Sequence, residues 1–315
     1  MIHFVFLGEQ LSLLLRHPDQ PDNAKVLKVA IIGAPNAGKS TLTNQLLGKK
    51  VFAVSKKVHT TRSRALGVLT KNDTQIILLD TPGLTTPSKV KRHQLEKSLL
   101  VDPWSTVKEA DLMVIMVDVA DRWMCSRLDF EVLKCLAEHP HIPAILVLNK
   151  VDLVKAKDRM LDITAQLTCG VVNGHRMRVR PDSNKPNSTL SKEQLNVLRS
   201  QQGWPHFKDV FMLSSVDRED VETLKSYFMV AAKPGSWQYH SEVLTDQSPE
   251  DICTNTIREK LLEYLPQEVP YSITQKMVIG TGGQMVARIA QETSEDLSKV
   301  YLREVKLKLS VKLRK

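Results

Sequence analysis

The residues with the clearest chemical potential stand at positions 33–40 and read GAPNAGKS. They match GxxxxGK[ST] and lie between an apolar run and a helix-like stretch, which is the context that a phosphate-binding loop requires. Backbone N–H groups at the start of a helix favour anions, so this loop can surround phosphates. Lys39 can neutralise terminal phosphate oxygens, and Ser40 can bind Mg²⁺. The predicted phosphate-contacting residues are Gly33, Ala34, Pro35, Asn36, Ala37, Gly38, Lys39, Ser40 and the adjoining Thr41.

A second candidate is DTPG at residues 80–83, which ends another apolar run. In enzymes with this type of loop an acid at such a position steadies Mg²⁺, so Asp80 is the predicted metal-associated carboxylate. The Gly83 N–H can then contact the γ-phosphate, with Thr81 and Pro82 between the two. Taken alone, DxxG is a weak signal because turns often contain it.

The candidate for base recognition is NKVD at residues 149–152. The Asp152 carboxylate can accept hydrogen bonds from N1–H and from the exocyclic amine of guanine. Adenine has an acceptor at N1 and no amine at C2, so the same carboxylate would stay unpaired against it, at a substantial cost. Asn149 and Lys150 would brace this loop. The motif therefore favours GTP over ATP as the ligand.

A fourth short motif, SSV, follows the last apolar run of the first two-thirds of the chain. Backbone N–H groups of Ser214, Ser215 and Val216 can meet guanine O6 if this turn lies beside the base. In isolation the two serines could equally be an ordinary helix cap.

Five short apolar runs must position these motifs. They are residues 26–33, 74–80, 111–118, 143–149 and 209–214. Near-continuous Val, Ile and Leu runs of this length are typical of strands buried on both faces of a parallel sheet. Helix-like stretches at 39–47, 126–138 and 219–231 alternate with them. The sequence therefore predicts an α/β fold with a mixed, mostly parallel sheet between helices, and with ligands at the carboxyl ends of the strands.

Composition narrows the class of protein further. The chain has 315 residues, is 42% hydrophobic and carries a formal net charge of +9. It contains no apolar run long enough to span a membrane, no paired cysteines and no metal-binding histidine spacing, so a transmembrane protein, a disulfide scaffold and a zinc site are not expected. The positive charge gathers in two windows, +4 at residues 171–205 and +6 at residues 299–315. Attraction for a polyanion is therefore expected to be local.

The four motifs occur in the order GAPNAGKS, DTPG, NKVD and SSV, which resembles a TRAFAC-class GTPase domain. HTTR at residues 59–62 resembles switch I of the Era/Der group. The resemblance implies that GTP, GDP and Mg²⁺ bind here, with Ser40, Thr61 and Asp80 near the metal and Lys39, Thr61 and Gly83 in catalysis. Thr60 remains an alternative to Thr61. Ras-like enzymes have a water-orienting glutamine where this chain has Leu84, so slow intrinsic hydrolysis is expected.

The second half of the chain makes the resemblance more specific. A turn-rich stretch precedes a helix with Ser248 as its predicted N-cap, followed by IREKLLEYLPQEVPY, the glycine-rich GTGG and a basic-faced strand predicted at residues 305–313. This resembles the C-terminal KH domain of Era GTPases, in which a GxxG loop clamps the nucleic-acid backbone. The long spacing from NKVD to SSV, with a basic insertion at about 171–207, resembles the mitochondrial branch of that family. The RNA-binding residues implied are Gly280, Thr281, Gly282, Gly283, Lys306, Lys308 and Lys312.

The resemblance divides the chain into a loosely packed leader at 1–23, an Era-type GTPase domain at 24–232, a linker at 233–248 and a KH-like domain at 249–315. The last of these is incomplete, because only residues 272–279 separate EVPY from GTGG. That interval is too short for the hairpin, strand and helix start that the family has there. We therefore expect intact nucleotide binding, weakened RNA binding and an unpaired strand edge.

The sequence leaves three possible functions open. The resemblance implies a GTPase that binds small-subunit ribosomal RNA and assists small-subunit assembly. A regulatory GTPase that acts through protein or membrane-surface contacts is the main alternative, and an ATP-using enzyme is disfavoured by NKVD. The family branch places the protein in the mitochondrial matrix, with peripheral association with the inner membrane. The leader has no convincing transit sequence, so the cytosol is the alternative.

Overall fold

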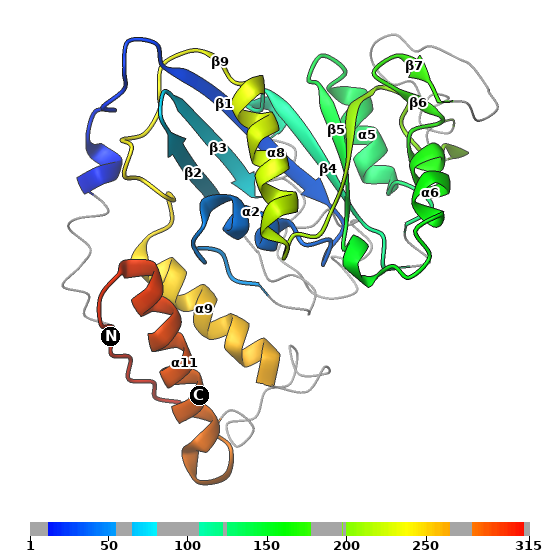
Figure 1. The fold of residues 1–315 in the computed structure, drawn as a ribbon. Helices are drawn as coiled ribbons and strands as arrows, with labels where there is room; N and C mark the ends of the chain where they lie inside the picture. The colour runs from blue at the N-terminus through cyan, green and yellow to red at the C-terminus, as the bar shows by residue number, and fades with distance from the viewer. Residues whose placement is uncertain are drawn as a thin grey trace.

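The computed structural model (Figure 1) describes residues 12–54, 65–80, 107–121, 125–177, 197, 200–264 and 279–311. Within them the chain forms an α/β unit followed by two C-terminal helices. The strands are β1 (Lys25–Gly33), β2 (Ala65–Lys71), β3 (Thr74–Asp80), β4 (Leu112–Asp118), β5 (Ala144–Asn149), β6 (Val171–Val172), β7 (His175–Arg176), β8 (Phe207–Leu213) and β9 (Lys233–Pro234). The helices are α2 (Lys39–Leu47), α5 (Phe130–Glu138), η1 (Val151–Leu153), α6 (Arg159–Leu167), α8 (Arg218–Ala231), α9 (Pro249–Tyr264), η3 (Thr281–Gly283) and α11 (Gln284–Tyr301).

The central sheet has seven strands in the order β2-β3-β1-β4-β5-β8, with β9 paired to β1 outside this path. Neighbours from β3 to β8 are parallel, whereas β2 is antiparallel to β3 and β9 is antiparallel to β1. The expected α/β class with a mostly parallel sheet is thus confirmed. Each of the five expected strands is present, with ends within two residues of the predicted ones.

Successive apolar side chains of a strand belong to different hydrophobic cores, one on each face of the sheet. On β1, Val29 and Ile31 belong to the core cluster that includes residues of α2 and α8, while Ala30 and Ile32 belong to the cluster that includes residues of α5 and α6. Successive side chains of a strand point to opposite faces, so a continuous apolar run is what a strand between two helical layers needs. Figure 1 shows α2 and α8 together against one face of the sheet.

Two local features differ from the sequence prediction. Strand β2 was not anticipated, because ALGVLTK contains glycine and two polar residues and lacks the continuous apolar run of a doubly buried strand. The helix expected at 126–138 begins four residues later, at Phe130. Asp129 is the N-cap of this helix. Its side chain accepts a hydrogen bond from the Glu131 N–H, and this bond fixes the start of the helix at Phe130.

The stretch predicted as a linker at 233–248 is packed onto the α/β unit. Its first residues form β9, so the sheet continues to Pro234, and Trp237 is buried. Further along, the Leu244 carbonyl accepts from the Val68 N–H at 2.8 Å, and Asp246 Oδ1 accepts from the Leu66 N–H at 2.9 Å. This stretch therefore extends hydrogen bonding along the exposed side of β2, which explains why an edge strand of modest apolarity is stable.

The predicted loose leader is also partly packed. Residues 1–11 lie outside the described part of the chain, but Asp19 accepts from the N–H and the hydroxyl of Ser241, and Gln20 accepts from the Trp237 N–H. Leu13 and Leu14 pack against the core. Residues 12–23 thus belong to the α/β unit, because the stretch after α8 supplies donors for their side chains.

The C-terminal unit consists of α9 and α11, which lie side by side in Figure 1, with the turn η3 at the start of α11. Ser248 is confirmed as the N-cap of α9, since its Oγ accepts from the Asp251 N–H at 3.1 Å. No helix among the described residues is long and apolar enough to cross a membrane.

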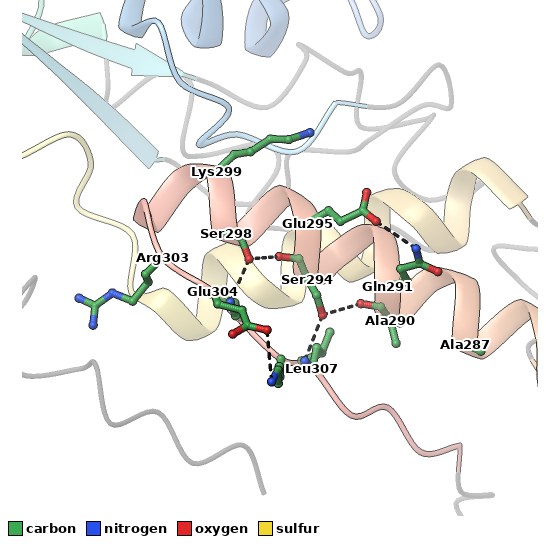
Figure 2. Close-up of a pocket in the computed structure, with 12 residues that line it drawn as sticks. Ala287, Ala290, Gln291, Ser294, Glu295, Ser298, Lys299, Arg303, Glu304 and Leu307 are labelled. Carbon is green, nitrogen blue, oxygen red and sulfur yellow. Dashed lines mark hydrogen bonds and ion pairs between the residues drawn. The ribbon is translucent and has the colours of Figure 1, made fainter.

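The strand predicted at 305–313 is wrong for the part that is described. Residues 304–311 run without regular secondary structure beside α11, and residues 249–264 and 279–311 contain no strand. The Val305 N–H donates to Ser298 Oγ at 2.9 Å, and the Leu307 N–H donates to Ser294 Oγ at 3.0 Å (Figure 2). The alternation survives, with Val305 and Leu307 half-buried and Lys306 exposed between them. Helix hydroxyls accept the bonds that a neighbouring strand would otherwise accept.

Candidate nucleotide-binding site

The phosphate loop joins the carboxyl end of β1 to α2, as predicted, and two glycines are required by its surroundings. A Cβ on Gly33 would stand 2.4 Å from the Met116 carbonyl oxygen on β4, so only glycine permits this approach. Gly38 has φ +98° and a Cβ there would lie 2.4 Å from Asn149 Nδ2. Gly38 is the N-cap of α2 and provides no side chain to cap the helix. The N-terminus of α2 thus has no side-chain cap, which is the arrangement that anion-binding helix starts use.

The Lys39 ammonium lies within this loop. It is buried, and its Nζ donates to the Gly33 carbonyl at 3.1 Å and to the Ala34 carbonyl at 2.9 Å. The loop carbonyls thus hold the positive charge at the helix N-terminus. This placement fits the predicted role of neutralising phosphate oxygens.

Asn149 connects three of the predicted motifs through one buried amide. Its Nδ2 donates to the Ala37 carbonyl of the phosphate loop at 2.7 Å. Its Oδ1 accepts from the Ser215 N–H at 2.9 Å and from Ser215 Oγ at 2.8 Å. Asn149 is only 1% exposed, so these bonds form away from water. The expected bracing role of Asn149 is therefore visible, and it extends to the phosphate loop.

The three residues of the SSV turn have backbone N–H groups in different environments. The N–H groups of Ser214 and Ser215 donate to Asp220 Oδ2 and to Asn149 Oδ1, so both are used inside the protein. Val216 is 68% exposed, and its N–H has no partner among the described residues. The donor available to a base oxygen is therefore Val216, and the two serines position it. Asp220 was missed by the sequence reasoning, and its only signal was its place in the first turn of the following helix.

The other two polar residues of NKVD have separate environments. Lys150, in the left-handed region with φ 66°, donates from Nζ to Asp118 Oδ2 at 2.5 Å. Asp118 Oδ1 accepts from the Ala120 N–H at 3.0 Å, so this acid caps the turn after β4. Asp152 lies in η1 and is exposed, with no ion pair or hydrogen bond to another described residue. Its carboxylate is thus exposed to solvent, and its contact with guanine N–H groups stays a prediction.

The structure describes only some of the remaining predicted site residues. Asp80 is the last residue of β3 and pairs in register with Ile31 of β1, two residues before Gly33, so its backbone reaches the same sheet edge as the phosphate loop. Ser40 and Thr41 stand in the first turn of α2. The predicted residues Thr60, Thr61, Thr81, Pro82 and Gly83, together with Leu84, lie outside the described residues.

The predicted RNA-contacting residues lie apart from the nucleotide motifs, on the C-terminal unit. The backbone of Gly280, Gly282 and Gly283 has positive φ values of 70°, 62° and 81°, and Gly283 is the N-cap of α11. Lys306 and Lys308 are exposed on the stretch beside α11, and Lys306 pairs with Glu304 at 3.2 Å. Thr281 belongs to η3, and Lys312 is outside the described residues.

Comparison with known proteins decides the family. The family model described as 50S ribosome-binding GTPase matches residues 28–150. The protein named GTPase Era, mitochondrial, of Salmo salar is 64% identical over 98% of this chain and 80% of its own length. The protein of the same name from Danio rerio is 60% identical with the same coverage. The chain belongs to the Era family of GTPases.

Era structures share the fold described above. A single-substitution variant of Aquifex aeolicus Era, bound to GDP and AlF4⁻, has a TM-score of 0.67 at 25% identity and covers 90% of this chain and 91% of its own. Era in complex with MgGDPNP and nucleotides 1506–1542 of 16S ribosomal RNA gives the same TM-score at 24% identity, covering 89% and 91%. The alignment with the Salmo salar protein runs over 367 positions, more than the 315 residues here. The relative thus has internal residues that this Era chain lacks.

Proposed function

We propose that this Era GTPase binds small-subunit ribosomal RNA under the control of GTP and assists assembly of the small ribosomal subunit in the mitochondrial matrix. The observation that carries the proposal is one chain that joins the GAPNAGKS loop, NKVD and SSV through Asn149 and has, on a separate helical unit, a glycine turn at the start of α11. The names of the relatives support the mitochondrial location. The solved Era complex with a 16S ribosomal RNA segment supports the RNA class.

The described residues fit a guanine nucleotide with Mg²⁺. The α2 N-terminus and Lys39 suit the phosphates, and Ser40 is the predicted Mg²⁺ contact on the same helix. Asp152 suits the base edge, with Val216 as the backbone donor. Mg²⁺ supplies charge neutralisation at the β- and γ-phosphates when it is bound. The predicted metal and γ-phosphate contacts at Thr61, Asp80 and Gly83 belong to this proposal.

On the RNA side, the glycine turn offers backbone N–H groups at the start of an 18-residue helix, and Lys306 and Lys308 are exposed beside the same helix. Backbone donors and cations are what phosphate recognition uses. However, the described C-terminal residues form no strand, so the sheet that completes a KH fold is missing from them. We therefore propose RNA binding that is weaker than that of a complete Era protein.

The test is a titration of the full chain with an RNA segment corresponding to nucleotides 1506–1542 of 16S ribosomal RNA, with the Era of the solved complex as the comparator. Measurements use Mg²⁺ with a non-hydrolysable GTP analogue or with GDP, at several salt concentrations. We expect binding that is tighter with the GTP analogue, at least tenfold weaker than the comparator, and strongly salt-dependent. Equal affinity in the two nucleotide states would contradict control by GTP.

A charge-reversal pair locates the RNA surface. Lys306→Glu with Lys308→Glu is expected to weaken RNA binding and to reduce the salt dependence by about two phosphate contacts. The matched control is Lys71→Glu with Lys208→Glu, which reverses two exposed charges on the α/β unit and should leave RNA binding near the parent value. Equal losses in both pairs would place the RNA elsewhere.

The alternative is a regulatory GTPase whose C-terminal unit no longer binds RNA. The absence of any strand within residues 249–264 and 279–311 favours it. If the titration shows no binding in either nucleotide state while GDP and GTP bind normally, this alternative replaces the proposal.

A further inference from the structure

An ion pair joins the end of β4 to the NKVD loop. Lys150 Nζ donates to Asp118 Oδ2 at 2.5 Å, and Asp118 Oδ1 accepts from the Ala120 N–H at 3.0 Å. The side chains of Asp118 and Lys150 are 22% and 30% exposed, so the pair is largely shielded from water. One carboxylate therefore caps the turn after β4 and also holds the side chain of the residue that follows β5.

Main-chain contacts fix the same two strand ends. Asp118 is the register partner of Asn149 in the parallel pairing of β4 with β5. The Val119 N–H then donates to the Asn149 carbonyl at 3.1 Å. Since Lys150 follows Asn149 directly, Asp118 stands at a fixed place beside it. The ion pair can therefore constrain the point at which the chain leaves the sheet.

Lys150 has a backbone conformation that residues with a Cβ rarely adopt. Its φ of 66° and ψ of 36° lie in the left-handed region, where the Cβ crowds the following carbonyl oxygen. This conformation turns the chain from β5 into η1, and the Leu153 N–H donates back to the Lys150 carbonyl at 3.1 Å. Asp152 lies within this turn, is exposed, and has no side-chain partner among the described residues. The direction of its carboxylate therefore follows from the turn that begins at Lys150.

We propose that Asp118 is a positioning residue for guanine recognition, acting through Lys150 on Asp152. A strained backbone conformation persists only where its surroundings hold it, and the ion pair with Asp118 supplies that hold at Lys150. A carboxylate that is already in position loses less conformational freedom when a ligand binds. The inference rests on the predicted contact of Asp152 with N1–H and the exocyclic amine of guanine. Asp118 therefore increases the preference for guanine over a base that lacks this amine.

The test compares GDP with inosine diphosphate, IDP, on the full chain. The base of IDP keeps N1–H and O6 but lacks the exocyclic amine, while its ribose and phosphates are those of GDP. The ratio of the Kd for IDP to the Kd for GDP, each with Mg²⁺, therefore measures the amine contact separately from phosphate binding.

Three variants are compared with the parent. Asp118→Asn keeps an oxygen that can accept from the Ala120 N–H and removes the charge that faces Lys150. Lys150→Met removes the ammonium and keeps an apolar stem. Asp162→Asn is the matched control, because Asp162 is an exposed acid on α6.

A displaced Asp152 loses two hydrogen bonds to GDP but only one to IDP, so the ratio should fall. The parent ratio is expected to be roughly tenfold or more, and Asp118→Asn and Lys150→Met should each lower it by roughly threefold or more. The double variant should match the single variants, because both break the same bond. Asp162→Asn should keep the parent ratio. A merely structural role for Asp118 would weaken GDP and IDP by the same factor, and this result, or no change in either Kd, would overturn the proposal.

Asp152→Ala separates failure of this proposal from failure of the predicted guanine contact. If the ratio falls in Asp152→Ala but stays at the parent value in Asp118→Asn, only the role of Asp118 is overturned. If the ratio stays at the parent value in Asp152→Ala, the guanine contact itself is wrong, and the role of Asp118 is overturned with it.

Discussion

The two units attach their loops in different ways. In the α/β unit one amide, Asn149, forms three hydrogen bonds at 1% exposure and joins the phosphate loop to the SSV turn. In the C-terminal unit two half-buried serine hydroxyls, on Ser294 and Ser298, hold the chain beside α11. A buried polar group that loses its partner pays the full desolvation cost, whereas an exposed one can bond to water. The nucleotide site is therefore rigidly specified, and the C-terminal attachment is easier to release.

The largest effect is expected at Gly38. Gly38→Ala introduces a side chain at φ +98° and against Asn149 Nδ2, which should cost about 2–4 kcal/mol through backbone strain and a displaced buried amide. The free energies of GDP binding and of unfolding measure it. Gly48→Ala is the control, because Gly48 also has positive φ at the other end of α2 but nothing lies within 4 Å of an added Cβ. It should leave GDP affinity nearly unchanged, and a similar loss in both variants would contradict the argument.

The second-largest effect is expected at the side-chain amide of Asn149. Asn149→Ala leaves the Ala37 carbonyl and the Ser215 donors without partners, so the free energy of unfolding should fall by about 2–3 kcal/mol, and GDP affinity should fall with it. Asp152→Asn, in the same motif but exposed, should lose guanine affinity while the free energy of unfolding changes by less than about 0.5 kcal/mol. Chemical denaturation and nucleotide titration separate the two. Equal stability losses would show that burial is not the difference.

A smaller, local effect is expected beside α11. Ser294→Ala with Ser298→Ala removes the acceptors of Leu307 and Val305 and should cost about 1 kcal/mol per bond. Hydrogen exchange at those two amides should become faster, while GDP affinity and GTP hydrolysis stay at the parent values. Ser310→Ala, at an exposed serine of the same stretch, serves as the control. Unchanged exchange in the double variant would mean that the serines do not hold the segment.

The smallest effect is a pH dependence of the contact between the two units, in which Lys50 Nζ donates to Asp296 Oδ2 of α11 at 2.8 Å. For Asp296, burial alone would raise the pKa, but hydrogen bonds and charges from Lys50 and Lys260 lower it below its ordinary 3.8. Its contribution to stability is therefore present above pH 3.8 and lost as pH falls through the lowered pKa. Lys50 has a pKa above 10.5, so its contribution is present below that pH and lost as pH rises further. Between these two pH limits the contact should not change the midpoint temperature of thermal unfolding of the parent. Below the lower limit the midpoint should fall as Asp296 is protonated, and Asp296→Asn should remove this part of the pH dependence.

Much of the fold was predictable because its signals are local. The five parallel strands and the loop at residues 33–40 follow from short apolar runs and a fixed spacing. Strand β2 was not predictable, since its stability depends on the packed stretch that contains Leu244 and Asp246, far along the chain. The predicted strand at 305–313 has the right alternation but no strand partner among the described residues, and alternation cannot say what a backbone will pair with.

By itself the sequence determined the chemistry of the site: a lysine among glycines for phosphate, and an aspartate for guanine. Only the tertiary structure decided which groups remain available. It gives the Ser214 and Ser215 N–H groups to Asp220 and Asn149 and leaves that of Val216 free among the described residues. It also buries Glu259 against Lys50 and Val54, about two hundred residues earlier in the chain. The reason is physical: residue type and spacing fix what a group can donate or accept, whereas folding decides which distant partner satisfies it.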